Sequence, residues 1–453
     1  MVIETSEFTT VRPARDWAAS ERPDFTSQTA SDKHGFTFDI AIVGLGYVGL
    51  PTALAFTESG SRVLGLDVSI GRLTTIREDR ADLLSEDRER LMRALNDKSL
   101  EMSSDLARLS QAAAVIVCVP TPVDQYLVPD LGILRAACAS VVAHAVRNQV
   151  IILTSTTYVG STRDMIMVPL GERGLEAGND IFVAFSPERI NPGSAGFAHE
   201  DVPRVVGGAT SSCTGAAASV LGAYVKLVHP VSSMEAAEMT KLTENIFRAV
   251  NIALANELAD VCRVLGLDVV DVIEAAATKP YGFMPFFPGP GVGGHCIPCD
   301  PHYLLWQLHK ARLGAPIIEQ AMTAIAARPR RVVDRVRQVL SGHSRGIAGT
   351  RVLIVGVAYK PNVEDIRESP ALEIIEELRD ESAIVAYYDP LCPVITLPDG
   401  EVLESVHDPR AFGADVAVVH TDHNTVDLSW LHEVPEVIDT TFRLTGVPHS
   451  VRL

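Results

Sequence analysis

The sequence predicts an α/β protein in which two doubly wound parallel-sheet domains are joined by a long central helix. Three observations lead to this prediction. Apolar strands alternate with helical segments in both halves of the chain, and a glycine-rich turn follows the first of these strands. The stretch from Ser232 to Leu265 contains neither proline nor glycine, so a helix that fills it is too long for an ordinary sheet crossover.

Composition narrows the classes of protein to consider. The chain has 453 residues and a net charge of −18, and an excess of carboxylates argues against a nucleic-acid binder. A small diphosphate remains possible, because one helix N-terminus can bind it locally. The seven cysteines are odd in number and spread through apolar runs, unlike a disulfide framework. With no signal peptide and no long apolar run, we expect a cytoplasmic protein with no membrane partner.

The N-terminal half begins with a polar tail and continues as a sheet. Residues 1–35 lack apolar periodicity, which predicts a disordered tail. The apolar run 36–44, bounded by glycine, predicts a buried parallel strand. Further strands are expected at 62–67, 113–119, 149–154 and 181–185, with helices between them.

The glycine-rich turn predicts a dinucleotide site. Gly44, Gly46 and Gly49 fit G-x-G-x-x-G directly after a strand, which permits a tight turn and close approach of the backbone to a pyrophosphate. The next strand ends in Asp67, about twenty residues on, where a carboxylate accepts from a ribose hydroxyl. An acid at this place favours NAD over NADP, so we expect a Rossmann-like domain that binds NAD. A structural turn with a surface aspartate is the alternative.

The second half begins with helices and ends with another sheet. Ser232 to Glu235 has capping-box spacing ahead of the long helix, which suits a spine between domains and a subunit contact. A helical region from 300 to 340, interrupted near Gly314 and Pro329, precedes a linker at 342–349. We then expect a strand at 351–356, a helix at 370–379, a strand at 383–388, a helix near Pro409 and a strand at 416–420. The predicted domains are therefore 36–230, 231–341 and 342–453.

The loop from Pro288 to Pro301 carries the most chemistry. Its glycines and prolines disfavour a regular helix or strand and can hold Cys296 on a rigid turn. A thiol there can act as a nucleophile if its pKa is lowered or a base is near. Three alternatives remain open: a redox pair of Cys296 and Cys299, a zinc site that includes nearby histidines, and inert buried thiols. A zinc site normally brings a second ligand pair, and none is evident.

The long helix carries a polar stripe. Lys241, Asn245 and Arg248 lie at i, i+4 and i+7, so they share one face. This face is either solvated or, if it lines a site, able to donate hydrogen bonds to a developing oxyanion.

Taken together, these features resemble the UDP-glucose/GDP-mannose dehydrogenase family over roughly residues 38 to 445. The resemblance rests on seven motifs in order: GLGYVGLP (44–51), CVPTPVD (118–124), TSTT (154–157), SPERINPG (186–193), KLTENIFRAVNIALANE (241–257), PGPGVGGHCIPCDPHYL (288–304) and VAYKPNVEDIRESP (357–370). It implies an NAD domain, a central helical dimerisation segment and a C-terminal domain that binds the nucleotide diphosphate. It also implies a four-electron oxidation of a sugar CH2OH to a carboxylate, through a thiohemiacetal and a thioester on Cys296.

The resemblance assigns roles to individual residues. Cys296 matches the nucleophile, Lys241 and Asn245 the oxyanion pair, Asp300 and Thr156 the groups that position a water, and Glu188 an acid of the substrate loop. The implied cofactor contacts are Gly44, Gly46, Tyr47, Val48, Gly49, Asp67, Arg72, Pro120, Thr121, Thr156 and Arg367. The implied substrate contacts are Glu188, Arg189, Lys241, Asn245, Phe287, Gly293 and Lys360. No metal is implied.

The cysteine loop also indicates a substrate branch. Gly291 to Cys296 reads GVGGHC, and Cys299 stands where the glucose branch has a lysine. This loop is more similar to enzymes that oxidise UDP-N-acetylhexosamines, so we expect UDP-N-acetylglucosamine first, UDP-glucose second and UDP-N-acetylmannosamine third. Cys299 and Val159 are unusual even for that branch, and an oxidised Cys296–Cys299 bond that silences the enzyme is a hypothesis beside an inert Cys299. Uronic acids commonly feed polysaccharide synthesis.

Overall fold

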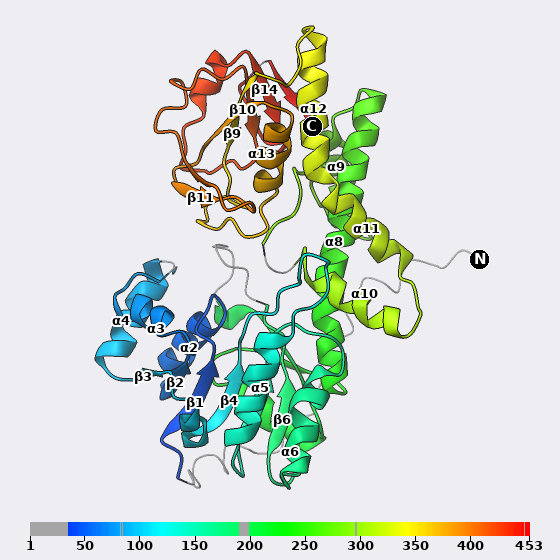
Figure 1. Ribbon diagram of the computed structural model, residues 1–453. Helices are drawn as coiled ribbons and strands as arrows, with labels where there is room; N and C mark the ends of the chain where they lie inside the picture. The colour runs from blue at the N-terminus through cyan, green and yellow to red at the C-terminus, as the bar shows by residue number, and fades with distance from the viewer. Residues whose placement is uncertain (1–34, 82, 84, 190–198, 295–296, 448) are drawn as a thin grey trace, which may run out of the picture. The chain divides into compact units, whose positions relative to one another are not determined.

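The computed structural model describes residues 35–453 except 82, 84, 190–198, 295–296 and 448. Contacts divide the chain into two compact units, Met1–Thr243 and Glu244–Leu453. Each unit contains a mostly parallel sheet with helices against it (Figure 1), which confirms the predicted α/β class with two Rossmann-like sheets. Within the described residues, no helix is both long enough and apolar enough to cross a membrane.

The sheet of the N-terminal unit has eight strands in the order β3-β2-β1-β4-β5-β6-β7-β8. The order reverses between β1 and β4, as in a doubly wound sheet. All neighbours are parallel except β6 and β7, which pair antiparallel, a direction that the alternating pattern did not predict. The strands are β1 (Phe38–Val43), β2 (Val63–Leu66), β3 (Leu100–Ser103), β4 (Ala112–Val117), β5 (Val150–Leu153), β6 (Phe182–Phe185), β7 (Arg204–Gly208) and β8 (Val228–Pro230).

Helices bury both faces of this sheet. Alternate residues of a strand point to opposite faces, and in β1 Ile40 and Ile42 pack with Leu54 and Phe56 of α2 in one cluster, together with parts of α4 and α7. α5 packs against β4. The helices are α2 (Gly49–Glu58), α3 (Ile70–Arg77), α4 (Ser85–Asn96), α5 (Gly132–His144), α6 (Val168–Glu172) and α7 (Ser211–Leu221), with short 3-10 turns at Leu106–Gln111 and His199–Asp201 and a π-helical turn at Arg163–Met167.

The predicted long helix is α8 (Met234–Leu265), and the division between the units falls within it. Its cap lies one residue later than the capping-box spacing predicted, because the Ser233 hydroxyl, rather than Ser232, accepts from the amide of Ala236 at 3.1 Å. Gly266, with φ of +70°, follows its end. The next helices are α9 (Val269–Ala277), α10 (Asp300–Lys310), α11 (Pro316–Ala326) and α12 (Arg328–Gly342). The helical region is thus interrupted near Gly314 and Pro329, as predicted.

The C-terminal unit contains a five-stranded parallel sheet in the order β10-β9-β13-β14-β15. Here the order reverses between β9 and β13. The elements are β9 (Arg351–Val355), α13 (Pro370–Asp380), β10 (Ile384–Tyr388), β13 (Val416–Val419), a 3-10 turn (Ser429–Glu433), β14 (Glu436–Asp439) and β15 (Ser450–Arg452), with a hairpin of β11 (Val394–Thr396) and β12 (Val402–Glu404).

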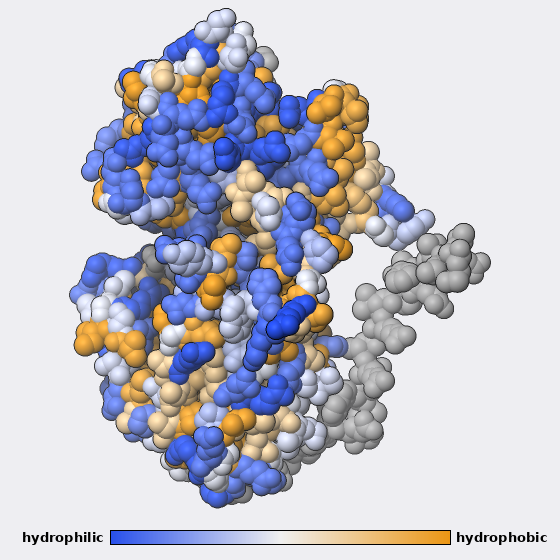
Figure 2. Space-filling view, turned by 45° about the vertical axis from the view of Figure 1, so that its right-hand side comes forward, coloured by the Kyte–Doolittle hydropathy of each residue, from blue (hydrophilic) through white to orange (hydrophobic). Residues whose placement is uncertain are grey.

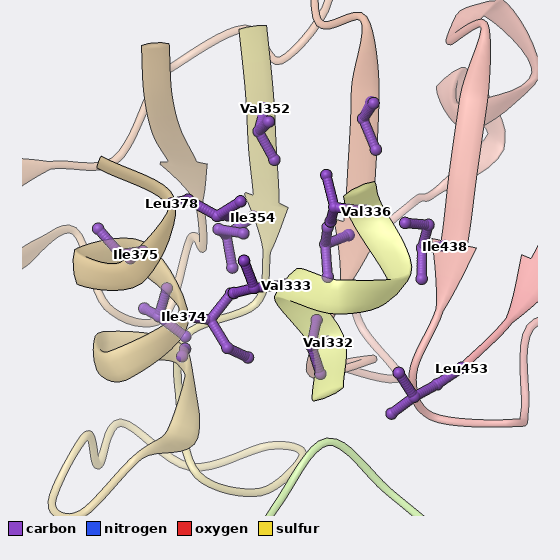
Figure 3. Close-up of a cluster of buried hydrophobic side chains, with 14 of the residues drawn as sticks. Val332, Val333, Val336, Val352, Ile354, Ile374, Ile375, Leu378, Ile438 and Leu453 are labelled. Atoms are coloured by element: carbon purple, nitrogen blue, oxygen red, sulfur yellow. The ribbon is translucent and has the colours of Figure 1, made fainter. Parts of the chain in front are cut away.

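The core of the C-terminal unit lies where α12 and α13 meet one face of this sheet. Figure 3 shows α12 valines pointing toward isoleucines of α13 and of the sheet. Val333 and Val336 are at most 1% exposed, and Ile354 and Ile374 are fully buried. Burying such side chains contributes about 1.5–3 kcal/mol each, so this cluster gives the sheet a rigid base.

The predicted helix near Pro409 is wrong. Residues 409–412 form turns, and Gly413 follows with a positive φ of +62°. The three residues between Pro409 and the left-handed Gly413 are too few for a stable helix, because the first turn fixes several residues for a single hydrogen bond.

Candidate active site

The glycine-rich loop between β1 and α2 is tightly packed. Gly44 has φ of +90°, and a Cβ there would lie 2.6 Å from the carbonyl oxygen of Cys118. A Cβ on Gly49 would lie 1.8 Å from the carbonyl oxygen of Gly44. By contrast, nothing lies within 4 Å of the position of a Cβ on Gly46. The two outer glycines are therefore required by the fold, whereas the middle one leaves open space in which a diphosphate can approach the backbone.

Asp67, at the end of β2, organises this loop. Its carboxylate accepts from the amide of Leu45 at 2.9 Å and from the amide of Ser69 at 2.9 Å. Arg72 donates from Nε to the carbonyl of Leu45 at 2.9 Å. Asp67 remains partly exposed, so it can still accept from a ribose hydroxyl. These residues fit a bound NAD, with the diphosphate over the loop and the adenosine ribose at Asp67.

The other predicted cofactor residues follow neighbouring strands. Pro120 and Thr121 come after β4, and Thr156 comes after β5. Because carboxyl ends of parallel strands share one edge of the sheet, this topology brings them to the edge that holds the glycine loop. The hydroxyl of Ser155 accepts from the amide of Val119 at 2.9 Å and so ties the two loops together. Of the loop side chains, Tyr47 is 36% exposed and Val48 is partly buried.

Glu188 lies after β6 in a buried ion pair. Its Oε2 is 2.5 Å from Nη1 of Arg204, and the two side chains are 9% and 1% exposed. Burial alone would lower the pKa of Arg204, but the adjacent carboxylate outweighs burial and raises this pKa. Lys241 donates from Nζ to the carbonyl of Glu188 at 2.8 Å, and the amide of Arg189 donates to Oε1 at 2.7 Å. The structure thus brings together three of the predicted residues around Arg204, which the sequence analysis missed.

Glu238, on the first turns of α8, was also missed. Its buried carboxylate accepts from the amides of Gly160 and Thr162 at 2.5 and 2.9 Å. The hydroxyls of Ser161 and Thr162 add hydrogen bonds of 3.0 and 2.7 Å. Burial raises the pKa of Glu238 and outweighs the lowering effect of these donors. Glu238 therefore fixes the segment that follows Thr156 to the helix that carries Lys241.

In the C-terminal unit, Asn245 and Asp300 form a hydrogen-bonded pair. The Nδ2 of Asn245 on α8 donates to Oδ2 of Asp300, the first residue of α10. Both side chains are at most 4% exposed. Cys299, which directly precedes Asp300 in the chain, is 2% exposed. The predicted nucleophile Cys296, together with His295, lies outside the described residues.

The loop that leads to Cys296 is packed against the segment after β9. The amide of Gly294 donates to the carbonyl of Arg367 at 2.9 Å. A Cβ on Gly293 would lie 2.6 Å from both the carbonyl oxygen of Glu368 and the Cβ of Tyr359. A larger residue at Gly293 would therefore displace this segment. Phe287, at the start of the loop, is 40% exposed.

Two basic residues of the predicted site lie on the same segment. Arg367 forms a two-pronged contact with the carboxylate of Asp365, with Nε at 2.9 Å and Nη2 at 2.6 Å. The Nζ of Lys360 lies 5.4 Å from the centre of the Tyr359 ring. Within the described residues, no group of three or more histidine, cysteine or acidic side chains is placed to hold a metal. The zinc alternative includes Cys296 and His295, which lie outside these residues.

The chain matches known proteins along most of its length. Models of the UDP-glucose/GDP-mannose dehydrogenase family match at residues 38–225 (NAD binding domain), 235–324 (central domain) and 353–443 (UDP binding domain). The chain is 33% identical to an NDP-N-acetyl-D-galactosaminuronic acid dehydrogenase of Ralstonia solanacearum, over 85% of this chain and 90% of the relative. It is 34% identical to a UDP-N-acetyl-D-glucosamine 6-dehydrogenase of Pseudomonas aeruginosa, over 78% and 82% of the two chains.

A solved structure agrees with these matches. The UDP-D-ManNAc dehydrogenase from Pyrococcus horikoshii superposes with a TM-score of 0.83 at 30% identity, covering 91% of this chain and 98% of that chain.

Proposed function

Because the chain belongs to the UDP-glucose/GDP-mannose dehydrogenase family and is an NAD-dependent nucleotide-sugar dehydrogenase, we propose that it oxidises C6 of a UDP-N-acetylhexosamine to the uronic acid. UDP-N-acetylglucosamine is the first candidate. UDP-N-acetylmannosamine is the named substrate of the Pyrococcus relative, and UDP-glucose is the alternative outside the N-acetyl sugars. The observation that carries the proposal is the buried Asn245–Asp300 pair, which places an amide and a carboxylate next to the loop of Cys296.

The residues divide the chemistry among them. Bound NAD supplies the acceptor for the hydride that leaves C6 in each of two oxidations. The first oxidation gives an aldehyde. Before the second oxidation, the sulfur of Cys296 adds to the carbonyl carbon of this aldehyde, and the carbonyl oxygen takes up a proton to give a thiohemiacetal. Oxidation of this adduct gives a thioester. The Lys241 ammonium and the Asn245 amide donate to the oxygen that gains charge at each addition.

Hydrolysis completes the cycle. Water attacks the thioester carbon, the carbon–sulfur bond breaks, and the products are the carboxylate, the free thiol and a proton. Asp300, oriented by Asn245, accepts a hydrogen bond from this water, with the Thr156 hydroxyl as its second contact. Glu188 and Arg189 border the sugar, and Lys360 binds the diphosphate.

We further propose that the enzyme is a homodimer formed through the C-terminal end of α8 and α9. Leu254, Val261 and Leu265 lie on one face of α8 and are 51%, 46% and 65% exposed, and Val264 beside them is 77% exposed. Figure 2 shows exposed apolar residues, in orange, where α8 ends and α9 lies. Apolar patches of this kind on a folded unit are typical of subunit contacts. Sedimentation of the Val264→Glu variant tests the proposal, since a dimer unaffected by this charge would contradict it.

The reaction is tested by counting NADH. Purified enzyme is mixed with NAD and a limiting amount of each of the three UDP-sugars, and NADH is followed at 340 nm. We expect two NADH per UDP-N-acetylglucosamine from the wild type and at most one from Cys296→Ala, because the second oxidation requires the thiohemiacetal. One NADH per sugar would indicate a two-electron dehydrogenase and contradict the covalent route. A preference for UDP-glucose would retain the route and reject the assignment from the cysteine loop.

A further inference from the structure

Asp389 is a fully buried carboxylate at the end of β10. Its Oδ2 accepts from the amides of Val357 and Ala358, at 2.7 and 3.2 Å, in the loop after β9. Its Oδ1 accepts from the amides of Leu391 and Cys392, at 2.9 and 3.2 Å. Burial acts to raise the pKa of Asp389, but His423 and the amides of Val357 and Ala358 outweigh it and lower the pKa. The group is therefore an anion that binds two loops at the carboxyl edge of the second sheet.

His423, in the loop after β13, covers this anion. Its side chain is 2% exposed, and its Nε2 lies 3.2 Å from Oδ2 of Asp389. Its Nδ1 accepts from the amide of Asn362 at 2.9 Å. Because a backbone amide can only donate, Nδ1 carries no proton, so the neutral ring donates from Nε2 to Asp389. One histidine thus links Asp389 to the far end of the loop after β9.

The backbone from 357 to 362 is consequently held at both ends. Asp389 binds Val357 and Ala358 at its start, and His423 binds Asn362 at its end. Asn362 adopts a positive φ of +62°, and its side chain accepts from the amide of Asn424 at 3.0 Å. Tyr359, Lys360 and Pro361 lie between these attachments, and the first two of them are used elsewhere in the C-terminal unit.

Tyr359 and Lys360 are the two of these three residues that bear on the proposed site. A Cβ on Gly294 would lie 2.9 Å from the Tyr359 ring, so the ring packs directly against the loop that leads to Cys296. A shift of the backbone at 357–362 would therefore move both a support of the cysteine loop and the lysine that faces the substrate in the proposed function.

Asp67 makes a related contact in the first sheet. Asp67 follows β2, which pairs with β1, and its carboxylate accepts from the amide of Leu45 in the loop after β1. Asp389 likewise follows β10, which pairs with β9, and accepts from amides in the loop after β9. Asp67 remains partly exposed, as a ribose ligand must, whereas Asp389 is sealed by His423. The same position thus serves ligand binding in one sheet and loop attachment in the other.

We propose that Asp389 and His423 are positioning residues for the UDP-sugar, which fix the backbone of 357–362 so that Lys360 meets the diphosphate and Tyr359 supports the cysteine loop. The inference rests on the proposed function, since that function places a nucleotide diphosphate at Lys360. Neither residue touches the substrate, so their effect is on affinity for the UDP-sugar rather than for NAD.

Two substitutions separate the two contacts of the histidine. His423→Asn retains an acceptor near the position of Nδ1 and loses the contact with Asp389. His423→Gln retains a donor near the position of Nε2 and loses the bond to the Asn362 amide. Val418→Ala, a cavity at a fully buried position of β13, is the matched control for lost stability. KM for both substrates, the Kd of UDP by calorimetry and amide exchange of 357–362 are measured for all of them.

We expect His423→Gln to raise KM for the UDP-sugar and Kd for UDP at least tenfold, to leave KM for NAD within twofold and to accelerate exchange at Asn362. His423→Asn should recover most of this loss, and Val418→Ala should leave both KM values within twofold. Equal effects of His423→Gln and Val418→Ala, or an unchanged Kd for UDP in His423→Gln, would overturn the inference and leave the proposed function standing. A wild-type enzyme that binds UDP but oxidises no UDP-sugar would overturn the proposed function, and the Kd values would still decide the role of His423.

Discussion

Replacing Arg204 with methionine is the most informative perturbation of the N-terminal unit. Methionine has a similar length but no charge, so Glu188 would remain buried beside an apolar side chain. With 1% and 9% of the two side chains exposed, water cannot replace the lost partner. Removing one member of a buried ion pair costs about 3–5 kcal/mol, and we expect a loss of that size in Arg204→Met.

The matched control is Arg328→Met in the C-terminal unit. Arg328 is also buried, but its partner Asp260, at 3.1 Å, is 36% exposed and can be solvated when the arginine is lost. We therefore expect a cost of about 1–2 kcal/mol there. The double variant Arg204→Met/Glu188→Met removes both charges and should be more stable than Arg204→Met alone, because no unpaired ion remains.

The pH dependence adds a second readout. Without Arg204, burial raises the pKa of Glu188 above its value in the unfolded chain. The folded state then binds more protons than the unfolded state near pH 5–6, so the cost of Arg204→Met should shrink as the pH falls from 7 to 5. Amide exchange of β6 and β7 measures the opening free energy at both pH values. A cost below 1 kcal/mol at pH 7, or a cost that does not fall on acidification, would refute the reasoning.

Three further outcomes are expected. Gly46→Ala should fold normally yet raise KM for NAD about tenfold or more, whereas Gly49→Ala should lose the loop itself, so that thermal unfolding and NAD titration separate the two. The six described cysteines are buried, so intact mass should show one carbamidomethyl group per native chain after iodoacetamide at pH 7.5, and none in Cys296→Ala. Burial lowers the pKa of His420 to about 4, and the unfolded chain binds the extra proton from about pH 6.5 downward, so this group removes about 2 kcal/mol of stability between pH 7 and 5. Urea unfolding of His420→Asn should lack that part of the loss, and an unchanged acid sensitivity would contradict the assignment.

Local sequence signals predicted the parts of the site that depend on local structure. Gly44 and Asp67 belong to one strand–turn–helix–strand unit, and their spacing alone predicts a dinucleotide-binding site. The long helix was recognised because its stretch lacks glycine and proline. The direction of β7 was not predicted, because an apolar strand reads the same whichever way it pairs.

Residues that act through distant partners were missed. Arg204 meets Glu188 sixteen positions away, and Glu238 binds a loop 76 to 78 residues before it in the chain. The only sequence signal for Arg204 was its position as a charged residue at the start of the apolar run 204–208. A charge in such a run indicates a partner, because an unpaired charge is rarely buried. His423 gave no such sign, because a histidine in a loop is ordinary until its partners are known.

The attachment of Glu238 to residues 160–162 has a consequence for how this enzyme diversifies. The helix segment that carries Lys241 and the segment after Thr156 are joined by four donors to one carboxylate, so evolution cannot adjust either segment without the other. In the proposed function Lys241 and Thr156 both take part in catalysis, so a change of sugar specificity that began here would disturb both of them. New specificities should therefore arise from substitutions in loops that bear no such shared attachment, and directed evolution toward another sugar should spare Glu238 and its four donors.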